Sequence, residues 1–422
     1  MVFRYLCVLV ALLLMFPLST GRDETKRAKV LLLGPTDQLP VTGSWLESDP
    51  LTSPTYVPSN THLTTLQGVQ IQKYIRLYFP RNYDRLLEFE YIMITGVEIY
   101  QYTQTQQQML HDAVLEEGLG SVQSRSVQSM ADFIAHPWAE SIVSDMFPND
   151  ADRVVSDRYS WENLFVRYVI NTNPNVPPIF TPYKDLEGVG GTLTEATTVI
   201  AIPKEGAVVT SYVVGGFPQG FPGIYPDPGF RSPGWMPQTM FWRYGNGTTW
   251  THHDVPGAGA WDAARNPYAP DMILAEFLFA TGREMPNDVV LVHRLRGKFA
   301  NFLSQKNFIY SLLDFIDKFG ANSGPVISKM KDISGVADRG RSAYVRQDYS
   351  ESMSIIEGAI VDLEALRSET MNLKDRALFW IYLIEWMVVS GAFLLSGYAI
   401  WSLMVRRKLY QEIGVTRLTT VE

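Results

Sequence analysis

The segment TWTHHDVPG, residues 249–257, places two adjacent histidines and an aspartate directly after an apolar run. Because histidine titrates near neutral pH, His253 beside Asp254 is a candidate acid–base pair. A zinc ion needs three or four ligands with their own supporting contacts. The further side chains that could supply such ligands are Asp262, His293 and His62.

The period of a β-strand argues against a ready-made metal site here. Adjacent strand residues point to opposite faces, so His252 and His253 cannot line one site while the strand continues. His252 and Asp254 can share a face, but the sequence has no H-E-x-x-H or similar ligand spacing. We therefore predict no metal and no cofactor, and we interpret His252, His253, Asp254 and Asp262 as a candidate small-ligand site.

Ser124 and Ser126, in the segment GSVQSRSVQ, are the candidate nucleophiles. The G-x-S-x-G signature of serine hydrolases is missing, and a serine is a poor nucleophile without a positioned base. The chain's one cysteine, Cys7, lies in the N-terminal apolar segment. A cysteine nucleophile is thus not expected after residue 21. Turn serines with local hydrogen bonds are favoured, and a serine hydrolase is the alternative.

The two ends of the chain indicate export and anchoring. Residues 1–21 combine Arg4, a short apolar stretch and small residues, which is typical of a secretory signal peptide. Residues 377–405 are apolar and long enough to cross a bilayer. Basic residues begin the tail, 406–422, which predicts a cytoplasmic C-terminus and a single-pass type I topology. Glu385 within the apolar run is expected near the outer headgroups.

Between these ends the sequence has two parts with different secondary-structure patterns. Residues 28–285 alternate short apolar runs with helical patterns, which predicts an α/β layered sheet with parallel neighbours. The runs at 28–34, 74–79 and 89–95 are expected strands. Residues 286–376 lack strand signals and predict a helical stalk with coiled-coil spacing of Ile356, Ile360, Leu363 and Leu366.

A glycine- and proline-rich segment with interleaved aromatics, 213–240, is expected to be a surface loop that contacts a partner. Asn246-Gly247 between apolar runs then predicts a hairpin turn. With Thr248, Asn246 also forms a glycosylation sequon. The formal charge of −8, from 36 basic and 44 acidic residues, gives no basic footprint for nucleic acid.

Several short pieces together resemble class I glutamine-amidotransferase-like domains. They are KVLLLG, EFEYIMITGVEIY, QQQMLHDAVLEEGLGSVQSRSVQSM, PKEGAVV and WRYGNGTTWTHHD. They are similar to the membrane-associated, non-catalytic members, known from archaea, and to trehalose-utilisation (ThuA-like) proteins. The resemblance covers residues 28–285 and implies a doubly wound, flavodoxin-like sheet. An active amidotransferase has a cysteine where this chain has GSVQSRSVQ.

The resemblance implies a membrane-anchored extracytoplasmic binding or assembly protein with an inactive domain. Expected partners are the lipid bilayer and a protein partner, or a second copy, held through the stalk and residues 213–240. The alternative is an exported hydrolase or carbohydrate-active enzyme using His252, His253 and Asp254. A third interpretation is a subunit of a membrane complex that makes its contacts through Glu385 and the span.

Overall fold

A computed structural model describes the elements that position these residues. It covers residues 27–34, 39–60, 66–124, 140–155, 166–190, 192–193, 200–215, 235–252, 257, 259–318 and 322–418. Four candidate residues of the sequence, together with the predicted signal peptide, lie outside these ranges: His62, Ser126, His253 and Asp254.

In the described part of the chain, nine strands form one mixed sheet in the order β2-β1-β3-β4-β11-β10-β9-β6-β7. Their bounds are β1 (Ala28–Gly34), β2 (Thr52–Pro58), β3 (Tyr91–Thr95), β4 (Gly120–Ser124), β6 (Val166–Ile170), β7 (Thr192–Leu193), β9 (Val208–Gly215), β10 (Trp235–Tyr244) and β11 (Gly247–His252). A separate two-stranded sheet pairs β5 (Asn149–Val155) with β8 (Ile200–Pro203).

The large sheet has a parallel half and an antiparallel half. Strands β2, β1, β3, β4 and β11 run parallel to one another. Strands β10, β9, β6 and β7 extend it with antiparallel neighbours. The predicted α/β sheet is therefore confirmed, and of the antiparallel pairs the β10–β11 hairpin is the one predicted above.

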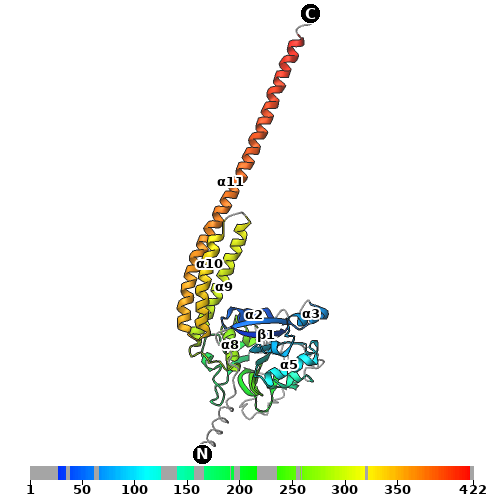
Figure 1. Ribbon diagram of the computed structural model, residues 1–422, viewed down its shortest axis with the longest axis vertical. Helices are drawn as coiled ribbons and strands as arrows, with labels where there is room; N and C mark the ends of the chain where they lie inside the picture. Colours follow the sequence, from blue (N-terminus) through cyan, green and yellow to red (C-terminus); the bar gives the residue numbers. More distant parts are fainter. Residues whose placement is uncertain are drawn as a thin grey trace, which may run out of the picture. The chain divides into compact units, whose positions relative to one another are not determined.

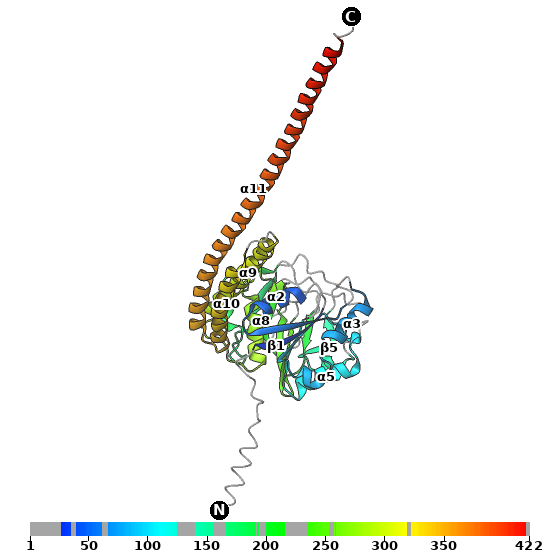
Figure 2. The same ribbon diagram turned by 45° about the horizontal axis from the view of Figure 1, so that its top comes forward.

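Helices cover both faces of the parallel half (Figure 2). One face carries α2 (Leu39–Ser48) and α8 (Ala269–Ala280), and the other carries α3 (Gly68–Tyr78) and α5 (Gln104–Leu115), with the single turns α4 (Tyr83–Leu86) and α7 (Ile142–Asp145). Short 3₁₀ turns connect them: η1 (Ile99–Gln101), η2 (Thr181–Tyr183) and η3 (Gly259–Trp261).

Both faces of the central strands are apolar, as expected for a covered sheet. On one face, Leu31 and Ile92 pack in a core with Ile71 of α3 and Leu110 of α5. On the other face, the rings of β3, β10 and β11 meet α8, and Tyr91 lies edge-on to Phe277. We call this second side of the sheet the α8 face.

One expected strand is wrong. Residues 74–79 belong mostly to α3, which begins at Gly68 and ends at Tyr78. Ile71 and Ile75 are its buried residues, four positions apart on one face, while its other side chains are largely solvated. The short window YIRLYF contains too little of this helical period to distinguish it from a strand.

The predicted hairpin forms, but its turn lies one residue earlier than expected. Strand β10 ends at Tyr244 and β11 begins at Gly247, so Gly245 and Asn246 form the turn. Gly245 has a φ of 58°, and a Cβ atom there would lie 2.2 Å from the backbone oxygen of Leu115. The turn therefore packs directly against the end of α5.

Replacing Gly245 by alanine should lower the free energy of unfolding by about 2–4 kcal/mol, because left-handed strain and a backbone clash add. Gly206→Ala is the matched control: it has a φ of 87° but nothing within 4 Å of an added Cβ. Its cost should be the strain alone, about 1–2 kcal/mol. Urea unfolding of both variants measures the difference, and equal losses would contradict the clash.

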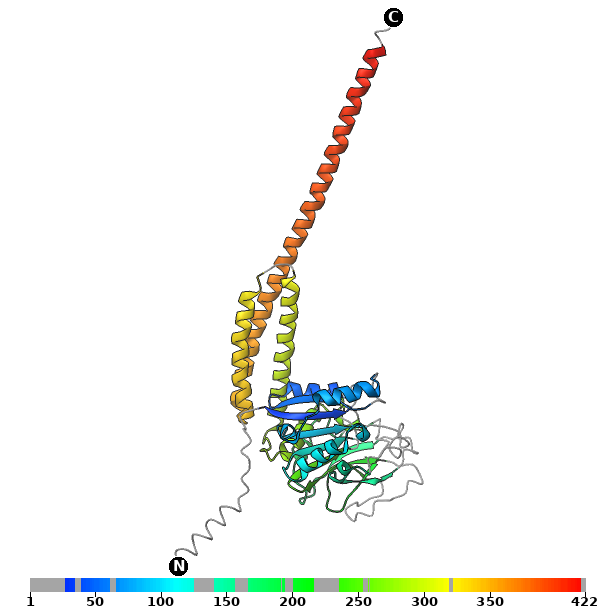
Figure 3. The same cartoon turned by 45° about the vertical axis from the view of Figure 1, so that its right-hand side comes forward.

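The chain divides into two compact units, residues 1–300 with 340–353 and residues 301–339 with 354–422. Three helices dominate the second: α9 (Val289–Asp317), α10 (Gly324–Val345) and α11 (Tyr349–Leu418). They lie side by side before α11 continues alone (Figures 1 and 3). The predicted stripe Ile356, Ile360, Leu363 and Leu366 is buried. These side chains pack within this bundle.

Among the described residues, α11 is the helix long and apolar enough to cross a membrane, between Tyr349 and Tyr410. The span expected at 377–405 lies inside it, and its large apolar side chains are exposed in the protein alone. The helix continues from the bundle into this segment without a break. The bundle and the span therefore share one continuous helix.

Candidate functional site

The candidate site lies at the carboxyl ends of two neighbouring parallel strands. Ser124 is the last residue of β4, His252 is the last residue of β11, and the two are register partners. In open α/β sheets the carboxyl ends of the strands face the usual ligand crevice. The topology therefore brings together two candidate residues that are far apart in the sequence.

His252 is held by a carboxylate that the sequence analysis did not single out. Its Nε2 atom lies 2.6 Å from Oε2 of Glu276 on α8, and both side chains are 0% exposed. The imidazole also stacks on Trp261, with ring centroids 4.7 Å apart and an interplanar angle of 19°. His252 is thus fixed in orientation and shielded from solvent.

The electrostatics of this pair follow from its burial. Burial raises the pKa of Glu276 above its ordinary value, and the neighbouring His252 opposes that shift. Desolvation disfavours the charged carboxylate, whereas a hydrogen bond from an imidazole favours it. The raised pKa means that removal from water outweighs the attraction of His252, so the carboxyl group retains its proton to a higher pH than a solvated glutamate.

Ser124 does not complete a catalytic triad in this arrangement. Its side chain is buried, and its Oγ atom has no hydrogen-bond partner within the protein. A nucleophilic serine needs a base within hydrogen-bond reach. Here the Nε2 atom of His252 is committed to Glu276, and its Nδ1 atom has no partner.

The two other candidates have local roles. Oδ1 of Asp262 accepts the backbone N–H of Ala264 at 3.0 Å, and Oδ2 lies 3.5 Å from Nε of Arg265. Asp262 therefore shapes the turn that leads to α8, and its interpretation as a ligand-binding residue stays a prediction. Asn246 is exposed on the hairpin turn, and its side-chain amide donates to the backbone oxygen of Glu116 at 2.6 Å. A glycan on Asn246 would attach to this same nitrogen.

The sequence around Glu276 could have identified this residue as a buried acid that needs a partner. It stands alone in MILAEFLFA, and the helix around it is almost wholly buried. An isolated acid in an apolar helix needs a buried partner, because an unpaired charge in the interior is costly. What the sequence could not supply was the partner, which comes from a strand end.

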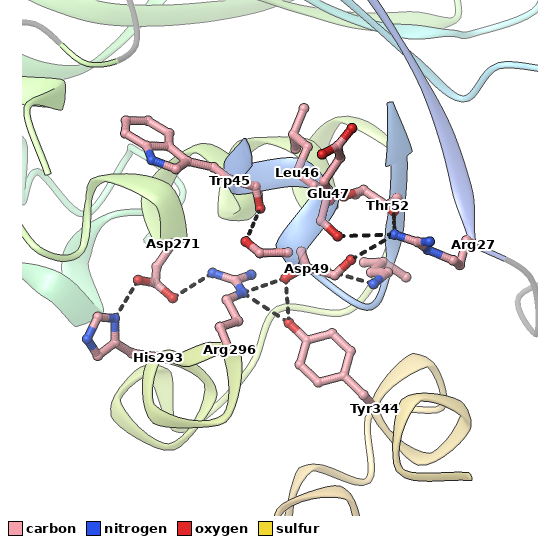
Figure 4. A network of polar contacts seen from close by, with 12 residues as sticks. Arg27, Trp45, Leu46, Glu47, Asp49, Thr52, Asp271, His293, Arg296 and Tyr344 are labelled. Carbon is pink, nitrogen blue, oxygen red and sulfur yellow. Dashed lines mark hydrogen bonds and ion pairs between the residues drawn. The ribbon is translucent and has the colours of Figure 1, made fainter. Parts of the chain in front are cut away.

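A second polar cluster, drawn in Figure 4, lies where the chain enters α9. Nε of Arg296 lies 2.6 Å from Oδ2 of Asp49, and its NH1 lies 2.6 Å from Oδ1 of Asp271. Tyr344 donates its hydroxyl to Asp49 at 2.9 Å. We call Asp49, Asp271, Arg296 and Tyr344 the clamp. Arginine suits this role because its planar fork binds two carboxylates at once.

Arg296 stays charged despite its burial. Burial works against the charged guanidinium of Arg296, but Tyr344, Asp49 and Asp271 outweigh it and keep its pKa above the ordinary value. Burial also raises the pKa of the Tyr344 hydroxyl, which remains a donor. The clamp therefore joins the end of α2 and the first turn of α8 to α9 and α10.

His293 belongs to this cluster and not to the strand-edge site. Its Nδ1 atom lies 2.7 Å from Oδ2 of Asp271, and its ring centroid lies 4.4 Å from that of Tyr268. His293, named above as one side chain that could supply a further ligand, is instead bonded to Asp271. Within the ranges that the structure describes, no three side chains of His, Cys, Asp or Glu form a group that could hold a metal ion.

Comparison with known proteins gives weak similarities. No family model and no curated protein matches the sequence. Among solved structures, the chain is similar to the cytoplasmic protein STM1381 from Salmonella typhimurium LT2, with a TM-score of 0.39 and 13% identity over 60% of this chain and 99% of that chain.

It is also similar to two glycosidases. One is a β-galactosidase from Rahnella sp. R3, with a TM-score of 0.31 and 8% identity over 59% of this chain and 30% of that chain. The other is the exo-β-1,4-mannosidase Op5Man5 from Opitutaceae bacterium strain TAV5, with a TM-score of 0.31 and 13% identity over 61% and 36%. The chain thus spans about a third of either glycosidase. None of the three proteins is described as an amidotransferase, and these scores support no inference about activity.

Proposed function

We propose that this chain is a membrane-anchored, extracytoplasmic binding or assembly protein whose amidotransferase-like domain does not catalyse. One observation carries the proposal: the histidine at the strand edge is wholly buried, stacked on Trp261 and bonded to Glu276. A general base must reach the proton that it removes from a substrate. A histidine closed in on all sides suits a structural role.

The parallel strand order supports the finer fold assignment. The order β2-β1-β3-β4-β11 corresponds to the 2-1-3-4-5 order of flavodoxin-like folds, whose ligands lie at strand carboxyl ends. Helices on both faces of the parallel strands agree with double winding. These features favour a flavodoxin-like, amidotransferase-like domain over residues 28–285. This domain has no cysteine to serve as the nucleophile of an active amidotransferase, because the one cysteine of the chain is Cys7.

The anchor follows from α11. At 1.5 Å per residue, residues 377–405 extend about 43 Å, which exceeds the ~30 Å hydrocarbon core. With Arg406 and Arg407 at the inner boundary, about 20 residues reach back to Trp386. Glu385 then lies at the outer headgroups, and the N-terminal units face away from the cytoplasm.

Exposed apolar side chains on the bundle support a protein partner or a second copy. Those on its helices include Leu303, Phe308, Tyr310, Phe315, Ile327 and Val361. Exposed apolar side chains in this number on three packed helices favour an interaction surface. The expected contact loop is wrong at both ends, because residues 213–215 belong to β9 and residues 235–240 belong to β10. Its central part, residues 216–234, lies outside the described ranges.

Membrane fractionation and co-purification test this function. The full chain should stay with membranes after a high-salt wash, and truncation after Arg376 should release it. A defined partner or second copy should co-purify from solubilised membranes, and Ile327→Glu with Val361→Glu should weaken that association. Ser328→Glu adds the same charge beside Ile327 without removing an apolar contact, so it should have no effect. A chain that always runs alone would contradict the proposal.

The runner-up is an exported hydrolase, and one observation favours it: Ser124 and His252 end neighbouring strands as register partners. Catalysis would require His252 to exchange Glu276 for Ser124, or Ser124 to meet the free Nδ1 atom. The carbohydrate-active variant relies also on His253 and Asp254, which lie outside the described residues.

A further inference from the structure

The three-helix bundle of the second unit ends along α11 close to the point where the apolar run begins. Thr370 is 0% exposed, whereas no side chain between Met371 and Tyr410 is buried. The run expected to span the membrane starts at Ala377, about two helical turns after Thr370. Very little solvated helix therefore separates the bundle from the apolar run.

The contact between α9 and α11 shows how far the bundle extends along α11. The guanidinium of Arg367 lies 5.0 Å from the centre of the Phe308 ring. The two helices run in the same direction, because α10 runs back between them (Figure 3). Asp317, the last residue of α9, follows Phe308 by nine residues. Since both helices rise by the same amount per residue, Asp317 lies level with about Arg376 of α11.

The contact between α10 and α11 gives nearly the same height. Nζ of Lys329 lies 2.7 Å from Oε2 of Glu369. Because α10 runs opposite to α11, its first residue, Gly324, lies five residues beyond this contact. Gly324 is therefore level with about Lys374. The two contacts agree within one helical turn.

We call the described residues where α9 ends and α10 begins, 317–318 and 322–324, the tip. Just beyond its height, α11 carries Phe379, Trp380 and Tyr382, whose side chains are 62%, 60% and 60% exposed. Tryptophan and tyrosine of a spanning helix are enriched at the level of the lipid headgroups. The tip thus lies about 5 Å along the helix axis from the first of these aromatic side chains.

The tip is polar and carries charges of both signs. Nζ of Lys318 lies 2.8 Å from Oδ2 of Asp314, and the two side chains are 68% and 72% exposed. Asp317 and Asn322 are also exposed. A lysine can pair with a lipid phosphate, and a carboxylate can pair with the ammonium group of a zwitterionic headgroup. Charged groups are costly in hydrocarbon, so the tip suits the headgroup layer and not the acyl chains.

We infer that the tip is a second membrane contact, which touches the phospholipid headgroups beside the point where α11 enters the bilayer. The inference rests on the proposed membrane anchor and adds the lipid surface that the bundle contacts. Packed helices lie about 8–10 Å apart, so the tip touches the lipid at about that distance from the span. Two contacts hold the bundle at one height above the membrane and limit its tilt.

Contact quenching of a fluorophore tests the position of the tip. Cys7→Ser removes the natural cysteine. Single cysteines then replace Asn322 at the tip, Ser304 on α9 and Ser396 in the span, and each carries the same small fluorophore. Ser304 is exposed and precedes Lys318 by 14 residues, so it lies about 21 Å farther from the membrane. The full chain is reconstituted in phosphatidylcholine vesicles whose lipids carry a nitroxide quencher on the headgroup or on the acyl chain.

Headgroup nitroxides should quench the fluorophore at position 322 and leave the one at position 304 bright. Acyl-chain nitroxides should quench only the fluorophore at position 396. An inserted helical segment, EAAAKEA, between Arg376 and Ala377 raises the tip by about 10 Å with little rotation. The insertion should abolish quenching at position 322 and leave position 396 unchanged, because the height of the tip is set by α11.

The possible failures can be told apart. If position 322 were quenched no more than position 304 while position 396 stayed quenched, the tip contact would be wrong and the membrane anchor would stand. Quenching of position 322 by acyl-chain nitroxides, or quenching that survives the insertion, would also overturn the contact as described. Loss of quenching at position 396 would overturn the anchor itself, and with it the proposed function.

Discussion

Replacing Arg296 by alanine should lower the free energy of unfolding by about 3–5 kcal/mol, the cost of leaving buried charges unpaired. Asp49 is 0% exposed and Asp271 is 4% exposed, so neither carboxylate can turn to water for compensation. The measurement is urea unfolding of the full chain, followed by tryptophan fluorescence.

Two further variants isolate the cause. Arg296→Lys retains the charge but loses the planar fork that contacts both carboxylates, so its loss should be intermediate. Arg85→Ala removes the exposed ion pair with Glu88 and should change stability little. If Arg296→Ala were as mild as Arg85→Ala, the clamp would contribute nothing to the connection between the sheet and α9.

Replacing Glu276 by alanine should lower the free energy of unfolding by about 2–5 kcal/mol, because Nε2 of His252 loses its partner and a cavity forms. Glu276→Gln should cost much less, since the amide can keep one hydrogen bond to Nε2 in the same space. Equal losses for the two variants would mean that the hydrogen bond to His252 is unimportant.

The raised pKa of Glu276 determines how the stability difference between Glu276→Gln and the natural chain changes with pH. Burial raises the folded pKa of Glu276 above the ordinary value of 4.5, so the folded chain binds more protons than the unfolded chain above that pH. Its contribution is fully present below the unfolded pKa and is lost as pH rises through the folded pKa. The stability of Glu276→Gln relative to the natural chain should therefore increase as the pH rises above the ordinary value of 4.5. A flat or falling difference would contradict the raised pKa.

Secondary-structure elements with a short, local sequence pattern could be predicted from the sequence. The run AKVLLLG is the strand β1 with its predicted bounds, since a compact apolar run ending in glycine suffices for a buried strand. The hairpin before His252 follows from an equally short pattern. Residues 74–79 show the limit, because a six-residue window cannot separate a strand from one face of a helix.

Only part of the candidate site could be predicted from local sequence patterns. The histidine was visible as a rare residue at a strand end, but its register with Ser124 depends on the order of the strands in space. The clamp could not be predicted from the sequence, because Asp49 and Arg296 are separated by 247 positions and neither belongs to a motif. Such pairs are set by the packing of helices on the sheet, which no local pattern encodes.

The most direct measurement is hydrolysis of ester, amide and glycoside substrates by the purified full chain, with Glu276→Gln and His252→Ala compared in parallel. A buried, bonded histidine without a serine in contact predicts no turnover above background in any of the three proteins. Turnover by the natural chain that disappears in both variants would contradict a binding or assembly role and make His252 a catalytic base.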